Sequence, residues 1–521
     1  MSSKDEQVCV LQLIRMQVVG IVDSLSVQTV LIADDTMVDI EDVGYEKFGF
    51  TNAALVKLNK RRLLTDEIPV FSGDSLIPSM IKTGDLIFVC LFFLIYWTYL
   101  GAISIYIRTW GCSHNSSDSE YMAGLLKEAG YNITASKAEA SLWILNSCTA
   151  KTPSEVHLEN TIKEAQSLGK AVVVAGCVSQ ADPEAKFLAN ISVVGVKQID
   201  QITDVVDQTL RGNCVKLLNR NRPHQKLSLP KMRRNRYIEV LAISSGCLNH
   251  CSYCKTKMAR GNLVSFHLDE LVEQARLAFS QGCREIWLTS EDLGAWGRDF
   301  DMVLPDLLEA LVEVIPEGCM LRLGMTNPPY ILDFLEEIAK ILRHPRVYSF
   351  LHIPVQSGSD PVLIDMKREY SVADFCKVVD YMIENVPDVY IATDFICAFP
   401  TETEEDFNES MNLVKKYHFP SVFINQFFPR PGTPASKMRK VDSVEAKRRT
   451  AEMSAYFRSY SRYTADRIGR IEEVLVCERA TDGVHYVGHN KSYEQILVPA
   501  LDNTIMGKFV KVQFCEANLL R

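Results

Sequence analysis

Three cysteines in one short loop carry the chemistry that the sequence shows first. Cys247, Cys251 and Cys254 follow the spacing C-x3-C-x2-C, directly after an apolar segment at 237–243 that we expect to form a strand. Three thiolates this close together can bind three irons of a four-iron cluster, and no fourth cysteine lies nearby, since the next one is Cys283. One iron is therefore left for a non-protein ligand. The alternative is a zinc site, although zinc prefers paired C-x2-C knuckles and a fourth nitrogen or sulfur ligand.

A second set of three cysteines is spread over the preceding part of the chain. From 103 to about 214, short apolar runs alternate with amphipathic segments, which indicates a parallel sheet with crossover helices. Cys112, Cys148 and Cys177 each stand at the carboxyl end of an expected strand, and in such a sheet these ends share one edge. One cysteine placed this way is usually an ordinary buried thiol. Three at equivalent positions favour a second metal site, again with one open iron.

Six strand–helix units follow between 237 and about 430, with strands expected at 237–243, 284–290, 320–326, 347–355, 389–399 and 421–428. Repeated units of this kind imply a parallel sheet that closes wholly or partly into a barrel, with the chemistry at the carboxyl ends of the strands. The cysteine loop lies at that edge. The same edge carries polar residues that could contact a cofactor or could serve as structural loop contacts: Thr289, Ser290, Glu291, Asn327, Gln356 and Asp394.

Two flanking segments could contact nucleic acid. The connector 215–236 holds eight basic residues and no acidic ones, which is typical of a solvated linker and also suits RNA phosphates. Residues 467–521 change to short alternating strands, which predict a small antiparallel barrel of a kind that often binds nucleic acid. We expect its polar face at His489, Asn490, Lys491 and Tyr493. A plain stabilising module is the alternative.

The length, net charge and cysteine count limit the class and the cellular compartment of the protein. A chain of 521 residues suggests about three domains, and its net charge of −9 excludes a generally basic nucleic-acid coat. Fifteen cysteines, odd in number and spread out, indicate a reducing compartment. The polar start of the chain predicts no cleavable signal peptide. Residues 1–85 suggest no function. The uncharged segment 86–102 would give roughly 25 Å of helix, the lower limit for a membrane span; a translated non-coding insertion or a cover for a domain face are the alternatives.

The cysteine loop resembles the signature of radical S-adenosylmethionine (radical SAM) enzymes, whose open iron is chelated by the amino and carboxylate groups of the cofactor. From about Ser104 to Phe514, the chain is similar to the methylthiotransferase family. The similarity is carried by RTWGCSHNSSDSEYMAG, LNSCT, AGCVSQ, YCKTKMARG, WLTSEDLGAWGRD, LRLGMTNPPYIL, LHIPVQSGSD and INQFFPRPGTPA. These segments resemble the eukaryotic and archaeal branch, which acts on threonylcarbamoyladenosine (t6A) next to the anticodon of tRNA.

The resemblance implies an α/β fold in three parts: a parallel-sheet methylthiotransferase domain (103–214), a radical SAM partial (βα)6 barrel (237–466) and a small all-β TRAM barrel (467–521). It further implies two 4Fe–4S clusters on the two cysteine sets. The loop cluster would cleave S-adenosylmethionine to a deoxyadenosyl radical that removes a hydrogen atom on the way to functionalising C2 of the purine, an unactivated C–H position that no side-chain base can deprotonate. The other would carry the sulfur that is methylated and transferred. Tyr253 would pack near the adenine of the cofactor, or serve as loop packing.

The implied partners are tRNA carrying t6A, S-adenosylmethionine and an unidentified electron donor, for a monomer in the cytoplasm or on the cytosolic face of the endoplasmic reticulum membrane. Another substrate (isopentenyladenosine or a protein) and a non-catalytic iron–sulfur RNA-binding protein are the alternatives. The chain departs from the family where Ala398 and Thr401 replace glycines of a turn. If those glycines need a positive φ, cofactor affinity is affected. We also expect the C-terminal barrel to be short of a last strand.

Overall fold

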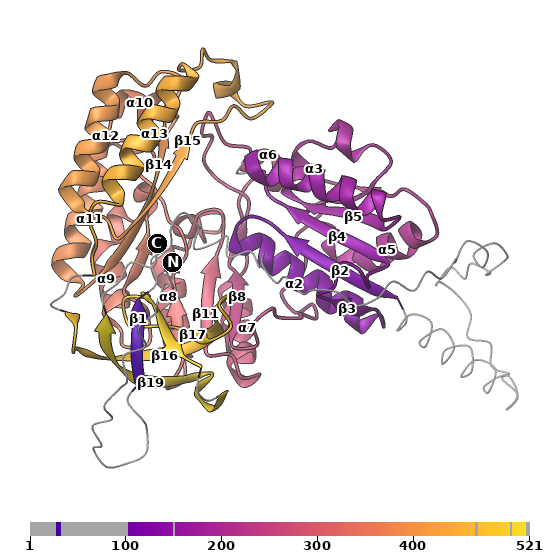
Figure 1. Cartoon of the computed structure of the whole chain (residues 1–521), viewed down its shortest axis with the longest axis horizontal. Coiled ribbons are helices and arrows are strands. Elements are labelled where there is room, and N and C mark those ends of the chain that lie inside the picture. The colour runs from indigo at the N-terminus through magenta and orange to yellow at the C-terminus, as the bar shows by residue number, and fades with distance from the viewer. Residues whose placement is uncertain (1–27, 33–102, 150–151, 464–466, 501–502, 517–521) are drawn as a thin grey trace, which may run out of the picture.

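The computed structural model of the protein describes residues 28–32, 103–149, 152–463, 467–500 and 503–516, which Figure 1 shows as three connected parts. We name them the N-terminal sheet, the partial barrel and the C-terminal barrel. The segment 86–102 and most of residues 1–85 lie outside the described residues. None of the helices in the described part of the chain has the length and apolarity that crossing a membrane requires.

The N-terminal sheet has six parallel strands in the order β3-β2-β4-β5-β6-β7. Its strands are β2 (Ser104–Thr109), β3 (Asn132–Thr134), β4 (Leu142–Ser147), β5 (Ala171–Gly176), β6 (Ser192–Val194) and β7 (Lys216–Leu217). Helices α2 (Ser113–Glu128) and α5 (Ile202–Leu210) bury apolar side chains on one face, and α3 (Thr152–Ser167) on the other. The predicted parallel sheet is confirmed. It extends further than predicted, because β7 lies inside the expected linker.

The partial barrel contains the six predicted parallel strands. They are β8 (Ile238–Ala242), β11 (Glu285–Thr289), β12 (Met320–Arg322), β13 (Phe350–His352), β14 (Tyr390–Cys397) and β15 (Ser421–Gln426). They form two three-stranded sheets that single bridges at Leu321–Val347 and Met325–His352 join into one curved wall. Among the described strands β8 and β15 do not pair, so the barrel stays open on one side.

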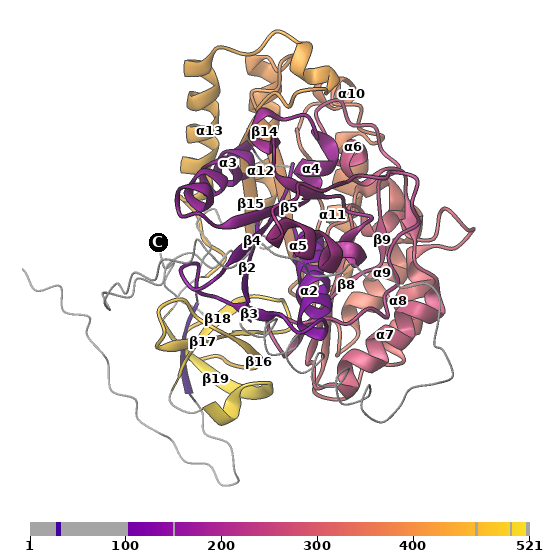
Figure 2. The same ribbon diagram turned by 90° about the vertical axis from the view of Figure 1, so that its right-hand side faces the viewer.

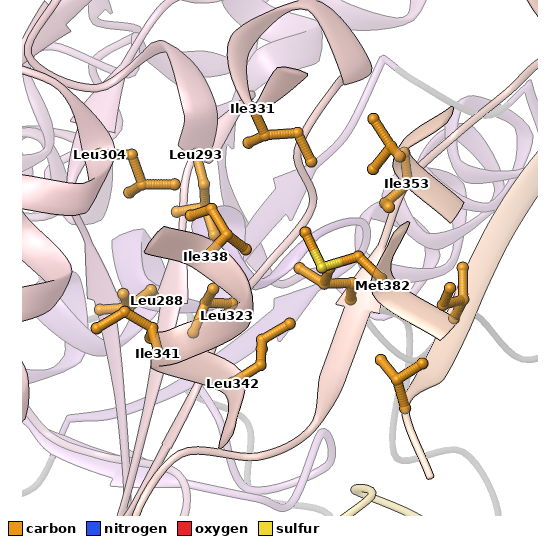
Figure 3. Packing of buried hydrophobic residues seen from close by; sticks show 14 of the residues in the cluster. Leu288, Leu293, Leu304, Leu323, Ile331, Ile338, Ile341, Leu342, Ile353 and Met382 are labelled. Carbon is orange, nitrogen blue, oxygen red and sulfur yellow. The ribbon is translucent and has the colours of Figure 1, made fainter. Parts of the chain in front are cut away.

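Helices cover the outside of this wall. They are α7 (Leu268–Ser280), α8 (Leu304–Val312), α9 (Leu335–Arg343), α11 (Val372–Asn385), α12 (Glu404–Tyr417) and α13 (Ser443–Phe457). Leu288 of β11 and Leu323, one residue past the end of β12, occupy alternate positions that point toward them, and Ile338 and Leu342 of α9 fill the space between, as Figure 3 shows. The residues between these alternate positions face the barrel interior, where the polar chemistry must lie.

The C-terminal barrel is closed. Its strands β16 (Ile471–Arg479), β17 (His485–His489), β18 (Gln495–Pro499) and β19 (Lys508–Glu516) pair in the order β18-β17-β16-β19. A strand from the start of the chain, β1 (Gln28–Ile32), pairs with β18 and β19 and completes the ring. Residues 467–516 supply four of the five strands and β1 supplies the fifth, so the expectation that the C-terminal segment is short of a strand stays a prediction. Local sequence could not reveal this closure, because the partner strands lie more than 400 residues away.

The expected nucleic-acid face of this barrel is instead its contact with the partial barrel, which corrects that prediction. His489 and Tyr493 are buried and stack on one another with ring centroids 4.1 Å apart. Asn490 is buried and donates to Glu494 of the same barrel. Lys491 Nζ donates to the main-chain oxygens of Leu342 and His344 at 2.8 Å each. Polar side chains in a hairpin look like a solvent face in sequence, but here His489, Lys491 and Tyr493 have partners that only docking provides.

The contact is built on the buried carboxylate of Glu285, at the first residue of β11. It accepts hydrogen bonds from Trp287 Nε1 (2.7 Å) and Tyr348 Oη (2.8 Å), and it pairs with His489 Nδ1 (3.1 Å) across the boundary. Burial raises the pKa of Glu285, but His489 and these hydrogen bonds together bring it below its ordinary value. The C-terminal barrel thus closes the amino-terminal end of the partial barrel and leaves the carboxyl end for chemistry.

The segment 215–236, which the sequence predicts to be a linker, also forms buried ion pairs in the structure. Lys231 is buried between Glu120 of α2 (3.3 Å) and Glu239 of β8 (2.6 Å), and Arg233 pairs with the same Glu239. These residues join the N-terminal sheet to the partial barrel, where α2 runs beside β8 in Figures 1 and 2. The prediction of a purely solvated or RNA-facing connector is wrong for Lys231 and Arg233. Five of its eight basic residues remain exposed: Lys216, Arg220, Lys226, Arg234 and Arg236.

The turn after β14 carries the departure from the family. Ala398 has φ +60° and is buried, and its N–H donates to Glu402 Oε2 at 2.7 Å. Thr401 is exposed and is not among the described residues with positive φ. A left-handed conformation costs a residue with a Cβ roughly 1–2 kcal/mol. The glycine requirement therefore applies at position 398 and not at 401.

We predict that Ala398→Gly raises the free energy of unfolding by about 1 kcal/mol, because the relief of the left-handed alanine exceeds the extra chain entropy that glycine loses. Thr401→Gly is the matched control and should be neutral or slightly destabilising. Urea unfolding of the two variants beside the parent chain measures both values. Equal effects of the two substitutions on the free energy of unfolding would show that the backbone at Ala398 is not strained.

We predict that Glu285→Gln lowers the free energy of unfolding by about 3 kcal/mol at neutral pH, since it removes the charged acceptor that three buried hydrogen-bond partners share. The pKa of Glu285 is depressed in the folded state, so its contribution is complete above its unfolded pKa and is lost as pH falls through the lower folded value. The stability difference between parent and variant should therefore shrink below about pH 4.5. Tryptophan fluorescence during urea unfolding at several pH values measures this difference. If the stability difference between parent and variant stays constant with pH, the ionised Glu285 carboxylate does not contribute to stability as predicted.

Candidate active site

The cysteine loop leaves the barrel through a tight turn. It runs from β9 (Ser244–Ser245) to α6 (Thr256–Arg260), and β9 pairs with β10 (Val264–Ser265), which follows the loop. Gly246 has φ +87°, and a Cβ there would lie 2.1 Å from the main-chain oxygen of Asn262. Cys247 N–H donates to Gly261 O at 3.2 Å and so closes the base of the loop. This closure places the three cysteines at the carboxyl end of β8, as predicted.

The three thiols form one electrostatic group. Burial raises the pKa of Cys247, and Asp292, Cys254 and Cys251 raise it further. Burial also raises the pKa of Cys251, whereas Arg368 opposes the increase. Thiols this close and this buried are costly to ionise without a bound cation. Their environment therefore fits a metal centre better than free thiolates.

Two residues that the sequence did not single out organise this group. Arg368 Nη1 donates to Cys251 Sγ at 3.1 Å, and its Nη2 donates to Asn327 Oδ1. Asn327 Nδ2 in turn donates to Asp292 Oδ2 at 2.6 Å, where burial raises the pKa of Asp292 to about 6. No local pattern marks Arg368, which follows α10 (Asp360–Asp365) and reaches the loop from over 110 residues away.

The structure places most of the predicted cofactor residues around this network. Thr289 is buried at the end of β11, and Ser290 Oγ accepts from the main-chain N–H of Asp292 at 3.1 Å. Gln356 has φ +71° and bridges to β14 through Phe395, a strained backbone of the kind found at binding sites. Their contacts with the cofactor stay predictions.

Two predicted cofactor residues have other surroundings. Tyr253 is 9% exposed in an apolar cluster and meets Phe399 edge to face at 6.4 Å, which matches the loop-packing alternative. Glu291 is buried against His114 of α2 (Nδ1–Oε1 2.9 Å) and Arg260 of α6 (Nε–Oε1 3.0 Å). Its carboxylate therefore lies at the boundary with the N-terminal sheet.

The second cysteine set converges at the carboxyl edge of the N-terminal sheet. Cys148 follows β4 and Cys177 follows β5, whose last residues Ser147 and Gly176 pair in register. Cys112 precedes α2, and its neighbour Gly111 lies so close that a Cβ there would stand 2.3 Å from Cys148 Cβ. Residues spread over 66 positions are thereby neighbours, because parallel strands end on the same side.

This edge faces the cysteine loop. Helix α4 (Cys177–Ala181) packs on α6 of the loop, and Cys177 lies in one apolar cluster with Ala259. Burial raises the pKa of Cys177, and Arg260 opposes the increase. The two cysteine sets therefore sit on either side of α6, although they belong to different sheets.

The residues fit the cofactors that the sequence implied. In the described residues, no three His, Cys, Asp or Glu side chains gather tightly enough to hold a single metal ion. Each thiolate of a four-iron cluster binds a different iron, so its ligands need not converge on one point. Cys247, Cys251 and Cys254 would hold one such cluster, and Cys112, Cys148 and Cys177 the other. Within the part of the chain that the structure describes, neither set has a fourth cysteine beside it.

Comparison with known proteins defines the class first. The profile described as radical SAM superfamily matches residues 241–414, and the one described as uncharacterized protein family UPF0004 matches 104–196. A solved radical S-adenosylmethionine methyltransferase from Kitasatospora setae is similar at a TM-score of 0.48 and 12% identity, over 64% of this chain and 77% of that one; this likeness is too distant to carry an argument. The chain is an α/β radical SAM enzyme that uses S-adenosylmethionine and 4Fe–4S clusters.

Curated relatives then define the family. The chain is 57% identical to a threonylcarbamoyladenosine tRNA methylthiotransferase of Xenopus laevis, over 81% of this chain and 76% of that protein. It is 67% identical to the Caenorhabditis elegans protein of the same name, over 65% of this chain and 80% of that protein. The human protein of that name is 56% identical over 81% of this chain and 73% of its own length. The chain belongs to the threonylcarbamoyladenosine tRNA methylthiotransferase family.

We predict that Arg368→Gln makes the loop cluster harder to reduce. The guanidinium places a positive charge and a hydrogen bond on Cys251 Sγ, and both favour the reduced, more negative cluster. The reduction potential should fall by on the order of 60 mV, a tenfold change in a one-electron equilibrium. A redox titration followed by electron paramagnetic resonance measures it. Arg343→Gln, which changes an exposed arginine on α9, is the control and should leave the potential unchanged. An unchanged potential in Arg368→Gln would refute the role.

Proposed function

We propose that this chain converts t6A next to the anticodon of tRNA to its 2-methylthio derivative. The observation that carries the proposal is identity of 57% over three quarters of the length of relatives named for that reaction. The meeting of two three-cysteine sets around α6 supports it, because sulfur transfer to a nucleobase needs the radical source and the sulfur source at one place. Isopentenyladenosine, a protein substrate and a non-catalytic role are the outcomes against which it is tested.

Bound to a reduced cluster, S-adenosylmethionine would supply a carbon-centred radical that removes a hydrogen atom on the way to functionalising C2 of the purine. The chain's own residues prepare the place. Cys247, Cys251 and Cys254 supply the thiolates, and Arg368 holds Cys251 while it orients Asn327. Asn327 fixes Asp292 beside Cys247. The closed amino-terminal end of the barrel leaves the carboxyl end as the entry for cofactor and substrate.

Further assignments complete the proposal. We take the N-terminal sheet (103–217) as the methylthiotransferase domain and the C-terminal barrel as a TRAM domain, which its closed all-β ring supports. We assign the exposed basic residues of the connector to contacts with tRNA phosphates. A monomer in the cytoplasm is the simplest assembly. Contact with the cytosolic face of the endoplasmic reticulum membrane depends on 86–102 alone, and the described residues give it no support.

We predict that Cys251→Ala abolishes cleavage of S-adenosylmethionine, while Cys148→Ala keeps cleavage and loses methylthio transfer, because the two sets hold separate clusters. Release of 5′-deoxyadenosine and mass spectrometry of tRNA nucleosides measure the two steps. Anaerobically purified parent protein should contain about eight irons, and each variant about four.

Three results would contradict this division of labour. Equal loss of cleavage in both variants would show that the sets do not act separately. Absence of 5′-deoxyadenosine from reconstituted parent protein would favour a binding protein. Cells without the gene that keep the methylthio form of t6A would show that the substrate is another molecule.

A further inference from the structure

A buried group of charged and polar side chains lies between the two cysteine sets. Its centre is Arg260, the last residue of α6, with a side chain 2% exposed. Arg260 Nη2 donates to Asp118 Oδ2 and to Asn115 Oδ1, both of α2 and both at 2.7 Å, and its Nε pairs with Glu291 Oε1 at 3.0 Å. His114 of α2 pairs with the same Glu291. We call these five residues the Arg260 group.

The Arg260 group touches the segments that carry both cysteine sets. Arg260 ends the helix that begins two residues after Cys254. Asn115 Oδ1, which accepts from Arg260, also lies 3.5 Å from Cys177 Sγ, and Asn115 Nδ2 donates to Trp110 O beside Cys112. Through Asn115, Arg260 is therefore linked to Cys177 and to the main chain two residues before Cys112, and its own helix follows the cysteine loop in sequence.

The charge of Arg260 also interacts with Cys177 and Cys112. Burial lowers the pKa of Arg260, but Asp118, Cys177, Glu291 and Cys112 raise it well above its ordinary value. The guanidinium thus stays charged, and it interacts electrostatically with Cys177 and Cys112, thiols that must become thiolates to bind iron. Its planar fork also fixes directions as well as distances, which a lysine would not do.

A second ionic group joins the same two parts and provides a contrast. Lys231 lies between Glu120 of α2 and Glu239 of β8, all with side chains at most 4% exposed. It fastens α2 to the outside of β8, and no contact of Lys231 with a cysteine of either set occurs among the described interactions. Attachment of the N-terminal sheet is therefore already provided elsewhere. The Arg260 group must do something more specific, since burying charges costs several kcal/mol per ion unless their geometry is good.

We propose that Arg260 is a positioning residue: through Asn115, Asp118 and Glu291 it sets where the strand-end cysteine set stands relative to the radical SAM loop. The inference rests on the proposed function, since it assigns the alignment of the two centres of that reaction. Displacement of about 1 Å can reduce a rate 10²-fold, so an alignment of this kind needs rigid, direction-specific contacts. The loss of the fork should therefore uncouple radical formation from sulfur transfer without abolishing either cluster.

The test is Arg260→Lys, which keeps the charge and removes the fork. Iron content and 5′-deoxyadenosine formation should stay near those of the parent protein, while methylthiolated nucleoside per 5′-deoxyadenosine falls about tenfold or more. In the metal-free protein, hydrogen exchange of the segments 113–118 and 177–181 should rise. Glu291→Gln keeps the shape and removes one charge, and it should give the same pattern if Arg260→Lys fails to fold.

Lys231→Met is the matched control. It breaks the other ionic group at the same boundary, so it should lower stability and leave the ratio of product to 5′-deoxyadenosine unchanged. An equal fall of that ratio in Lys231→Met, or an unchanged ratio and unchanged exchange in Arg260→Lys and Glu291→Gln, would overturn the proposal. If the parent protein makes no methylthiolated nucleoside, the proposed function fails instead, and the hydrogen exchange of the metal-free variants still decides the role of Arg260.

Discussion

One constraint governs this molecule: two parallel strand systems must meet edge to edge, each with the carboxyl ends of its strands facing the other. Parallel strands gather their ligand-binding loops at that end, so neither system can place chemistry elsewhere. The boundary between them is held by buried charge rather than by an extended apolar surface. Buried ion pairs are weak sources of stability, but they are strict about geometry. For a site that must align two metal centres, contacts with a defined geometry matter more than contacts that add stability.

The amino-terminal end of the partial barrel, opposite the site, must be shielded from water. The carboxylate of Glu285 and the rings of Tyr348 and Phe350 would face water there, but the C-terminal barrel covers them with His489 and Tyr493. Arg322 is fully buried in the same region, where its guanidinium lies 5.0 Å from the rings of both Phe350 and Tyr493. The polar residues of the closing barrel are therefore used for docking. Binding of nucleic acid by that barrel would have to use other residues.

Strain is placed where the site needs unusual backbone. Gln356 and Ala398 both have positive φ near the carboxyl edge of the partial barrel, although neither is glycine. Such positions persist only where surrounding contacts over-determine them. At Ala398 the contact is visible, since Glu402 accepts its N–H and is itself held by buried Arg449 at 2.8 Å. The turn is thus kept in shape by an ion pair in place of a glycine.

The sequence by itself determined the alternation of strands and helices, the two cysteine sets and the edge at which each set lies. Those features depend on local periodicity and on the rule that parallel strands end together, both of which can be read along the chain. Tertiary structure alone decided the rest: the Arg260 group, the reach of Arg368 to Cys251, the closure of the C-terminal barrel by β1 and the burial of His489 and Lys491. Each of these brings together residues that lie far apart in the chain, and three of the four pair a charged or polar side chain with its distant partner. A charged side chain looks alike in sequence whether water or a buried partner satisfies it, and only packing distinguishes the two.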